Sequence, residues 1–141
     1  MVTIAPVLIT IGRARPPLAH TCTAPDRRFI EDARTNLTAL VLWGEQYESG
    51  DARAADVAAE ARSAAKILHG TVPTDPSLAQ TRRLLLGMLS EYARAVTLQE
   101  RHREAGPHMY RAYGLANYAH DVLAAAQPAL AARGCDLAEL L

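Results

Sequence analysis

The sequence has no excess of charge of either sign and few aromatic residues. It contains 15 Lys and Arg residues against 15 Asp and Glu residues, and 5% of its residues are aromatic. A neutral domain lacks the broad positive field that supports non-specific binding to nucleic acid, so we do not expect a nucleic-acid partner. No run of about 18 apolar residues occurs, and we therefore expect no membrane-spanning helix.

Cysteine is nearly absent as well. Cys22 and Cys135 lie near opposite ends of the chain and match neither a CxxC redox motif nor a zinc-ligand spacing. The apolar residues near the N-terminus precede Arg13 and Arg15, which is the reverse of the order in a secretory signal. We therefore expect a cytoplasmic protein with two reduced thiols. The alternative is a bridge between Cys22 and Cys135, because an up-down bundle would bring both to the same end.

The motifs of the large enzyme classes are missing too. The sequence has no phosphate-binding loop, dinucleotide fingerprint, HExxH motif, nucleophile elbow or paired CxxC motifs. It therefore predicts neither a cofactor nor a metal, and it leaves open whether the protein is an enzyme.

What the chain does contain favours one helical domain. Its 141 residues suit a single core, and half of them are hydrophobic, with alanine prominent among them. The single Lys beside many Arg residues suggests a high-GC bacterial genome. In such bacteria, small helical proteins of this composition are common as accessory proteins, including those that serve specialised metabolism.

Hydrophobic residues recur at helical spacing along most of the chain. Proline and glycine divide these segments, and Asp75 before Pro76 is a good helix start. We expect an irregular N-terminal arm over residues 1–24 and a single domain over 25–141. That domain is predicted to be an all-α, up-down four-helix bundle. Its expected helices cover residues 26–49, 52–69, 76–104 and 108–126, followed by short helical turns over 129–141.

One candidate site centres on His120, which falls in the middle of the expected inward stripe of the last long helix. Tyr113 on the same helix, Tyr92 on the facing helix and Glu48 could line a polar pocket with it. Such a pocket could perform acid/base or cyclisation chemistry on an apolar molecule. The alternative for His120 is a core histidine whose ring nitrogens are satisfied by hydrogen bonds.

A second candidate site is a ligand-sized cavity between helices. Glycine inside a helix costs about 1 kcal/mol relative to alanine, so Gly44 suggests either close helix packing or a cavity wall. Trp43 lies beside it, and Gln99 is the main polar residue of the lower stripe on the third helix. We therefore take Trp43, Gly44 and Gln99 as candidate ligand-binding residues.

A metal site is a weaker hypothesis. His102 and His108 flank a Gly-Pro turn and Glu104 could be a third ligand. The alternative, which we favour, is a solvated helix end whose basic residues complement the helix dipole.

The third helix has more apolar surface than one bundle stripe needs. Residues 84–89 are apolar on every side of the helix, so something outside the usual stripe must cover Leu84 and Leu86. A second copy of the chain and the N-terminal arm are the two options, and we slightly favour the homodimer.

These observations lead to two functional hypotheses. The first is a non-enzymatic accessory or binding protein that uses a helical apolar surface or a small interhelical pocket to take a small apolar ligand or a partner protein. The alternative is a small enzyme that uses the His120 pocket.

Overall fold

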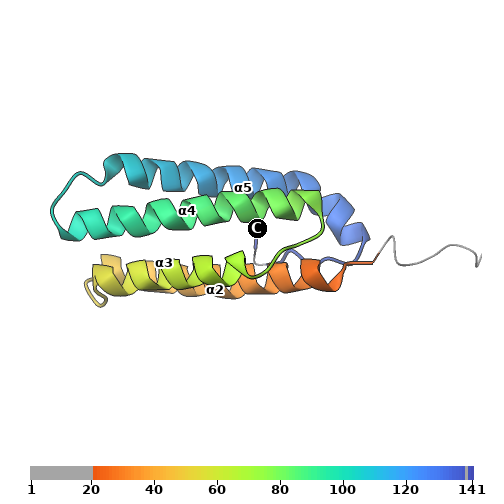
Figure 1. The fold of residues 1–141 in the computed structure, drawn as a ribbon, viewed down its shortest axis with the longest axis horizontal. Coiled ribbons are helices and arrows are strands. Elements are labelled where there is room, and N and C mark those ends of the chain that lie inside the picture. Colours follow the sequence, from red (N-terminus) through yellow and green to blue (C-terminus); the bar gives the residue numbers. More distant parts are fainter. Residues whose placement is uncertain (1–20, 139) are drawn as a thin grey trace, which may run out of the picture.

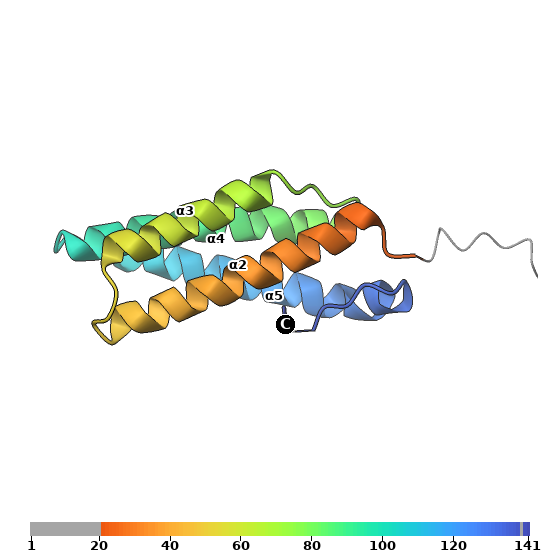
Figure 2. The ribbon, with the colours of Figure 1, turned by 90° about the horizontal axis from the view of Figure 1, so that it is seen from below.

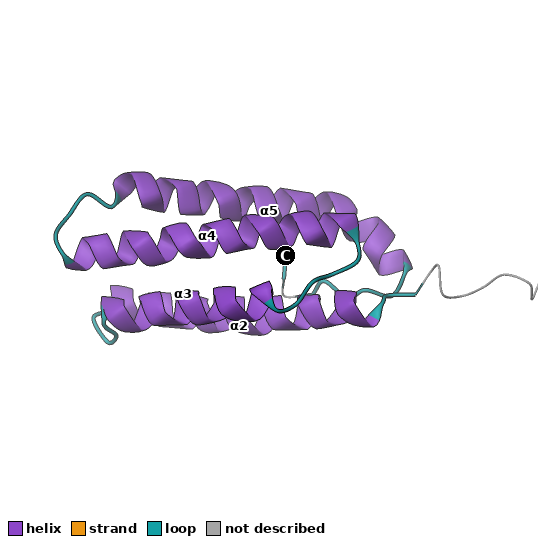
Figure 3. Cartoon of the chain, viewed as in Figure 1, coloured by secondary structure: helices purple, strands orange, loops and turns teal. Residues whose placement is uncertain are grey.

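The structure, a computed structural model, describes residues 21–138 and 140–141. This part of the chain contains four α-helices and no β-strand (Figure 3). The helices are α2 (Ala24–Glu48), α3 (Ala54–His69), α4 (Pro76–Glu100) and α5 (Gly106–Ala132). The predicted all-α four-helix bundle is confirmed, while residues 1–20 of the expected arm lie outside the described residues. No helix in the described ranges has the length and apolar character needed to cross a bilayer.

The helices form two layers, α2 with α3 and α4 with α5, and successive helices run in opposite directions (Figures 1 and 2). α4 is the central helix because it packs on both α3 and α5, whereas α2 packs chiefly on α3. The C-terminal half of α2 diverges from α5 (Figure 2). The bundle is therefore tightest along α4 and loosest between α2 and α5.

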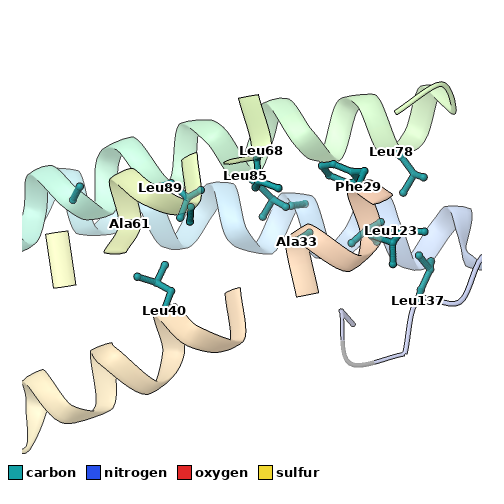
Figure 4. Packing of buried hydrophobic residues seen from close by; sticks show 14 of the residues in the cluster. Phe29, Ala33, Leu40, Ala61, Leu68, Leu78, Leu85, Leu89, Leu123 and Leu137 are labelled. Atoms are coloured by element: carbon teal, nitrogen blue, oxygen red, sulfur yellow. The ribbon is translucent and has the colours of Figure 1, made fainter. Parts of the chain in front are cut away.

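Side chains from all four helices and the C-terminal tail meet in one core (Figure 4). Phe29, Leu68, Leu78 and Leu89 are fully buried in it. The buried face of α3 consists mostly of alanine, and alanine lets neighbouring helices approach closely. The core thus combines close backbone packing around α3 with large side chains contributed by α2 and α4.

Local sequence signals determine where the helices begin. The Asp75 carboxylate accepts hydrogen bonds from the Ser77 and Leu78 amides at 2.8 and 3.0 Å, directly before α4. The Thr23 hydroxyl similarly caps α2 by accepting from the Asp26 amide at 3.3 Å. The predicted role of Asp75 as an N-cap is confirmed.

Two predicted helix ends were wrong. α4 ends at Glu100 instead of residue 104, because His102 adopts a positive φ of 54° and turns the chain. α5 continues past Pro128 to Ala132, although we expected this proline to end it. Proline removes one backbone hydrogen bond, and near a helix end only a few residues follow it. The last turns of α5 bend from the axis of the rest of the helix (Figure 1).

The apolar run of residues 84–89 needs less outside cover than we expected. Leu85 and Leu89 are buried, and Leu84, Leu86 and Met88 are half-buried and pack against the core. Because α4 lies between two neighbouring helices, it buries more than one stripe. Packing within the bundle therefore supplies part of the cover that we expected from a second copy or from the N-terminal arm.

The expectation of two reduced thiols was also wrong. Cys22 and Cys135 form a disulfide with a Cα–Cα distance of 5.1 Å, and both residues are buried. The Cys22 amide also donates to the Arg133 carbonyl at 2.6 Å. The bridge thus joins the start of α2 to the tail that follows α5.

Candidate functional site

A groove of about 410 Å³ lies between α2, α4 and α5. This volume lies within the usual range of small-molecule sites, about 300–1,000 Å³. We refer to this feature below as the groove. Its lining residues are Leu37, Leu40, Val41, Gly44, Glu45, Glu48, Leu85, Met88, Tyr92, Ala112, Tyr113, Ala116, Ala119, His120, Leu123 and Leu140.

The divergence of α2 from α5 explains why this groove exists. In the first half of α2, Phe29, Ile30 and Ala33 are buried in the core. In the second half, Val41 and Leu42 are 59% and 54% exposed, since no helix covers them. The side chains of α4 therefore form the floor of a groove that opens between α2 and α5.

The C-terminal tail contributes to one end of the groove. The Arg34 guanidinium on α2 donates to the carbonyls of Ala138 and Asp136 at 2.9 and 3.0 Å, which holds the tail against this helix. Leu137 is buried in the core and Leu140 joins the groove lining. Both the disulfide and these hydrogen bonds therefore position the wall that Leu140 forms.

Gly44 and Tyr92 bring α2 and α4 close together inside the groove. A β-carbon at Gly44 would lie 3.1 Å from the Tyr92 hydroxyl oxygen, which is tighter than ordinary van der Waals contact. Glycine at this position therefore leaves room for the phenol beside the α2 backbone. Both residues line the groove, so the close contact and the cavity wall that we considered for Gly44 occur at one place.

The other end of the groove is polar. Burial raises the pKa of the Tyr92 phenol above its usual value, and the neighbouring Tyr113, Glu48 and Tyr47 raise it further. Tyr92 therefore stays protonated at neutral pH and can donate a hydrogen bond. Glu45 and Glu48 reach the same part of the lining from the last turns of α2.

His120 lies at the mouth of the groove, so the alternative of a histidine buried in the core was wrong. Its side chain is 56% exposed, and its Nδ1 lies 3.7 Å from a carboxylate oxygen of the neighbouring Asp121. The helical stripe to which His120 belongs does point inward, but at this level it faces the open groove. An exposed imidazole at a groove mouth needs no buried partner.

The structure brings most of the predicted site residues together. Tyr92, Tyr113, Glu48 and His120 line the groove with Gly44, but Trp43 and Gln99 are not among its lining residues. Trp43 is 36% exposed on α2. Gln99 instead accepts a hydrogen bond of 3.4 Å from the Tyr47 hydroxyl. Gly44, next to Trp43, faces the groove, and helical geometry turns Trp43 away from it; Gln99 follows Tyr92, the last α4 residue of the lining, by seven positions.

Some lining residues escaped the sequence analysis. Glu45 follows Gly44 directly, and its spacing from Glu48 places both carboxylates on one face of α2. That spacing could have indicated an acidic patch on α2 from the sequence alone. Nothing in the sequence pointed to Leu140, because its place depends on how the tail folds back.

The proposed metal ligands do not converge. The His108 Nδ1 lies 2.6 Å from a Glu91 carboxylate oxygen, and Arg111 contacts both residues. These contacts join α4 to α5 as an ion-pair cluster. No group of three metal-ligating side chains occurs within the ranges that the structure describes.

The comparisons with known proteins provide no further assignment. No protein-family model, curated protein or solved structure matches this chain.

Proposed function

We propose that the protein is a non-enzymatic binding protein that takes a small, largely apolar molecule into the groove between α2, α4 and α5. The observation that carries this proposal is the groove, with its leucine, methionine and alanine floor and polar groups at one end. Sites for small molecules commonly combine an apolar lining with a few polar groups. A role in bacterial specialised metabolism agrees with the composition and is a further part of the proposal.

A bulky side chain inside the groove should abolish ligand binding. Ala116 on α5 is half-buried in the lining, so Ala116→Trp places an indole in the groove. We expect this variant to bind a neutral apolar dye such as Nile red at least about tenfold more weakly than the wild type, since filling the site removes buried apolar contact. Fluorescence titration measures this change.

Ala125→Trp is the matched control because Ala125 is exposed on α5 and does not line the groove. Both variants should keep the helical circular dichroism of the wild type. Equal dye affinity for the two variants would contradict the proposal. Mass spectrometry of ligands recovered after incubation should also show them chemically unchanged.

The enzyme alternative rests on one observation, that His120, Tyr113 and Tyr92 line the same groove. Imidazole is the commonest general acid or base of enzymes, and Tyr92 could donate a hydrogen bond. Within the described part of the chain, the carboxylate in contact with the imidazole is that of the exposed Asp121 next to it, at 3.7 Å. We favour the binding function because, among the residues that the structure describes, no buried group holds His120 in one orientation.

If the protein forms the predicted homodimer, we propose that the interface lies on α2 and α5 and not on residues 84–89 of α4. Val41 and Leu42 on α2 and Tyr110 and Tyr113 on α5 are exposed apolar or aromatic residues. A second copy, or a partner protein, would bury them. We expect light scattering at micromolar concentration to give twice the chain mass of 15.2 kDa, and Leu42→Glu to halve that mass. A wild-type mass near 15.2 kDa throughout this range would rule the dimer out.

The predicted cytoplasmic location is now opposed by the disulfide. Bridges between cysteines persist mainly in oxidising compartments and are rare in the cytosol. We therefore favour an oxidising environment for the folded protein.

A further inference from the structure

The charged residues of the groove all cluster at one end, and their sign is negative. Among the lining residues, Glu45 and Glu48 carry carboxylates, and no arginine or lysine is present. Within the described part of the chain, neither carboxylate forms an ion pair with a basic residue. The lining also contains one imidazole, that of His120. A ligand charge placed at this end would therefore interact with uncompensated negative groups.

Aromatic rings lie beside these carboxylates. Tyr92 and Tyr113 line the groove, and Glu48 and Tyr113 are close enough to Tyr92 to raise its pKa. The face of a tyrosine ring attracts cations, and the protonated hydroxyl offers an oxygen that accepts hydrogen bonds. Carboxylates together with phenol rings make a suitable environment for an ammonium group.

The remaining lining is apolar along the groove. Leu37 lies three turns before Glu48 on α2, and a helix rises about 1.5 Å per residue, so these positions are separated by about 16 Å. Leu123 and Leu140 lie with Leu37 in the apolar part of the lining. An elongated ligand could place an apolar chain there and a polar head beside Glu48.

From these observations we infer that the groove binds amphiphilic cations, molecules with an apolar chain and a protonated amine, with the amine beside Glu45, Glu48 and Tyr92. This inference rests on the proposed binding function and specifies its ligand class. An anionic amphiphile of the same length would place its carboxylate beside two carboxylates without a basic partner. A neutral alcohol would gain only from the apolar surface.

Three ligands with the same chain test the inference: decylamine, decanol and decanoate, titrated at pH 8 and below their aggregation concentrations. An alkylamine is protonated at this pH, as the ammonium group of lysine is. Displacement of Nile red should give the tightest binding for decylamine, weaker binding for decanol and the weakest for decanoate. Added salt should weaken decylamine binding and reduce the disadvantage of decanoate, because exposed charges are screened, and it should change decanol binding least.

The double variant Glu45→Gln/Glu48→Gln should lower the affinity for decylamine about three- to tenfold, as expected for partly exposed ion pairs, and leave decanol binding unchanged. Glu31→Gln is the matched control, since Glu31 is exposed on α2 and does not line the groove. Decanoate binding as tightly as decylamine, or an unchanged amine affinity in the double variant, would overturn the inference. The proposed binding function would then still stand through decanol. If none of the three ligands binds and Nile red does not bind either, both the inference and the proposed function fail.

Discussion

Reduction of the Cys22–Cys135 disulfide should lower the free energy of unfolding by about 4–5 kcal/mol. The bridge joins residues 113 positions apart, so it closes a loop that contains the whole helical bundle. In the chain-entropy model, a crosslink stabilises by restricting the unfolded chain, and a loop of this length gives about that value. Many domains are stable by only about 5–15 kcal/mol, so the reduced protein should be close to marginal stability.

Urea unfolding with and without a reducing agent measures this difference. The double variant Cys22→Ala/Cys135→Ala is the control, because it should resemble the reduced wild type and no longer respond to the reducing agent. Similar unfolding midpoints for the oxidised and reduced wild type would show that the crosslink restricts the unfolded chain little. That result would contradict the chain-entropy argument for this protein.

The loss of the bridge should also affect the groove, although less than it affects stability. The tail after α5 is held by the disulfide and by the hydrogen bonds of Arg34 to Asp136 and Ala138. Leu140 belongs to this tail and lines the groove. Ligand affinity and redox state are therefore physically connected through one short segment.

The helices were predictable because their signals are local. Asp75 with Pro76 begins α4, and Gly50 and Gly70 follow the ends of α2 and α3, as the sequence indicated. Hydrogen bonds between residues two or three positions apart fix such boundaries, and the sequence shows those residues directly. The two helix ends that we predicted wrongly have no such local signal. The end of α4 depends on the backbone conformation of His102, and α5 continues through a proline within its last turns.

The contacts between distant segments were less predictable. The helical wheel placed Tyr92, Tyr113 and His120 on inward stripes, and all three line the groove. It could not show that α2 diverges from α5, and this divergence turns the environment of His120 from core into groove mouth. The Cys22–Cys135 bridge likewise depends on the path of the tail. Up-down topology brings both ends of the bundle together, but a disulfide needs Cα atoms within roughly 7 Å.

The hydrogen bonds of Asp26 are another set of long-range contacts that the sequence does not reveal, because its main partners lie in the loop before α4. It is a buried carboxylate, 1% exposed, at the start of α2. It accepts hydrogen bonds from the amides of Thr74 and Asp75 at 2.7 and 3.0 Å, and from the Thr74 hydroxyl at 3.1 Å. The sequence marks Asp26 only as an acidic residue in a first helical turn. The folded chain uses it to join the start of α2 to the start of α4.

Replacement of Asp26 by alanine should lower the free energy of unfolding by about 3 kcal/mol at pH 7. A polar group left without a partner inside a protein costs about 1–3 kcal/mol, and Asp26→Ala removes the acceptor of two partly buried amides, those of Thr74 and Asp75. Urea unfolding monitored by circular dichroism measures the loss. Asp32→Ala is the control: the half-buried Asp32 accepts one side-chain hydrogen bond, from Thr71 at 2.7 Å, so we expect a loss of about 1 kcal/mol. Equal losses in the two variants would contradict the role of Asp26.

Asp26→Asn separates the charge from the hydrogen bonds, because the amide oxygen can still accept from both backbone amides. Burial alone would raise the pKa of the Asp26 carboxyl, but the hydrogen bonds from Asp75, Thr74 and Thr23 outweigh burial and lower it. A carboxyl whose pKa is lower in the folded state stabilises the protein above its unfolded pKa, and this contribution disappears as the pH falls through the folded pKa. The wild type should therefore exceed Asp26→Asn in stability at pH 7, and the difference should shrink below about pH 4. Unfolding measured at a series of pH values tests this, and a difference that stays constant down to pH 2 would show that the charge of Asp26 does not contribute.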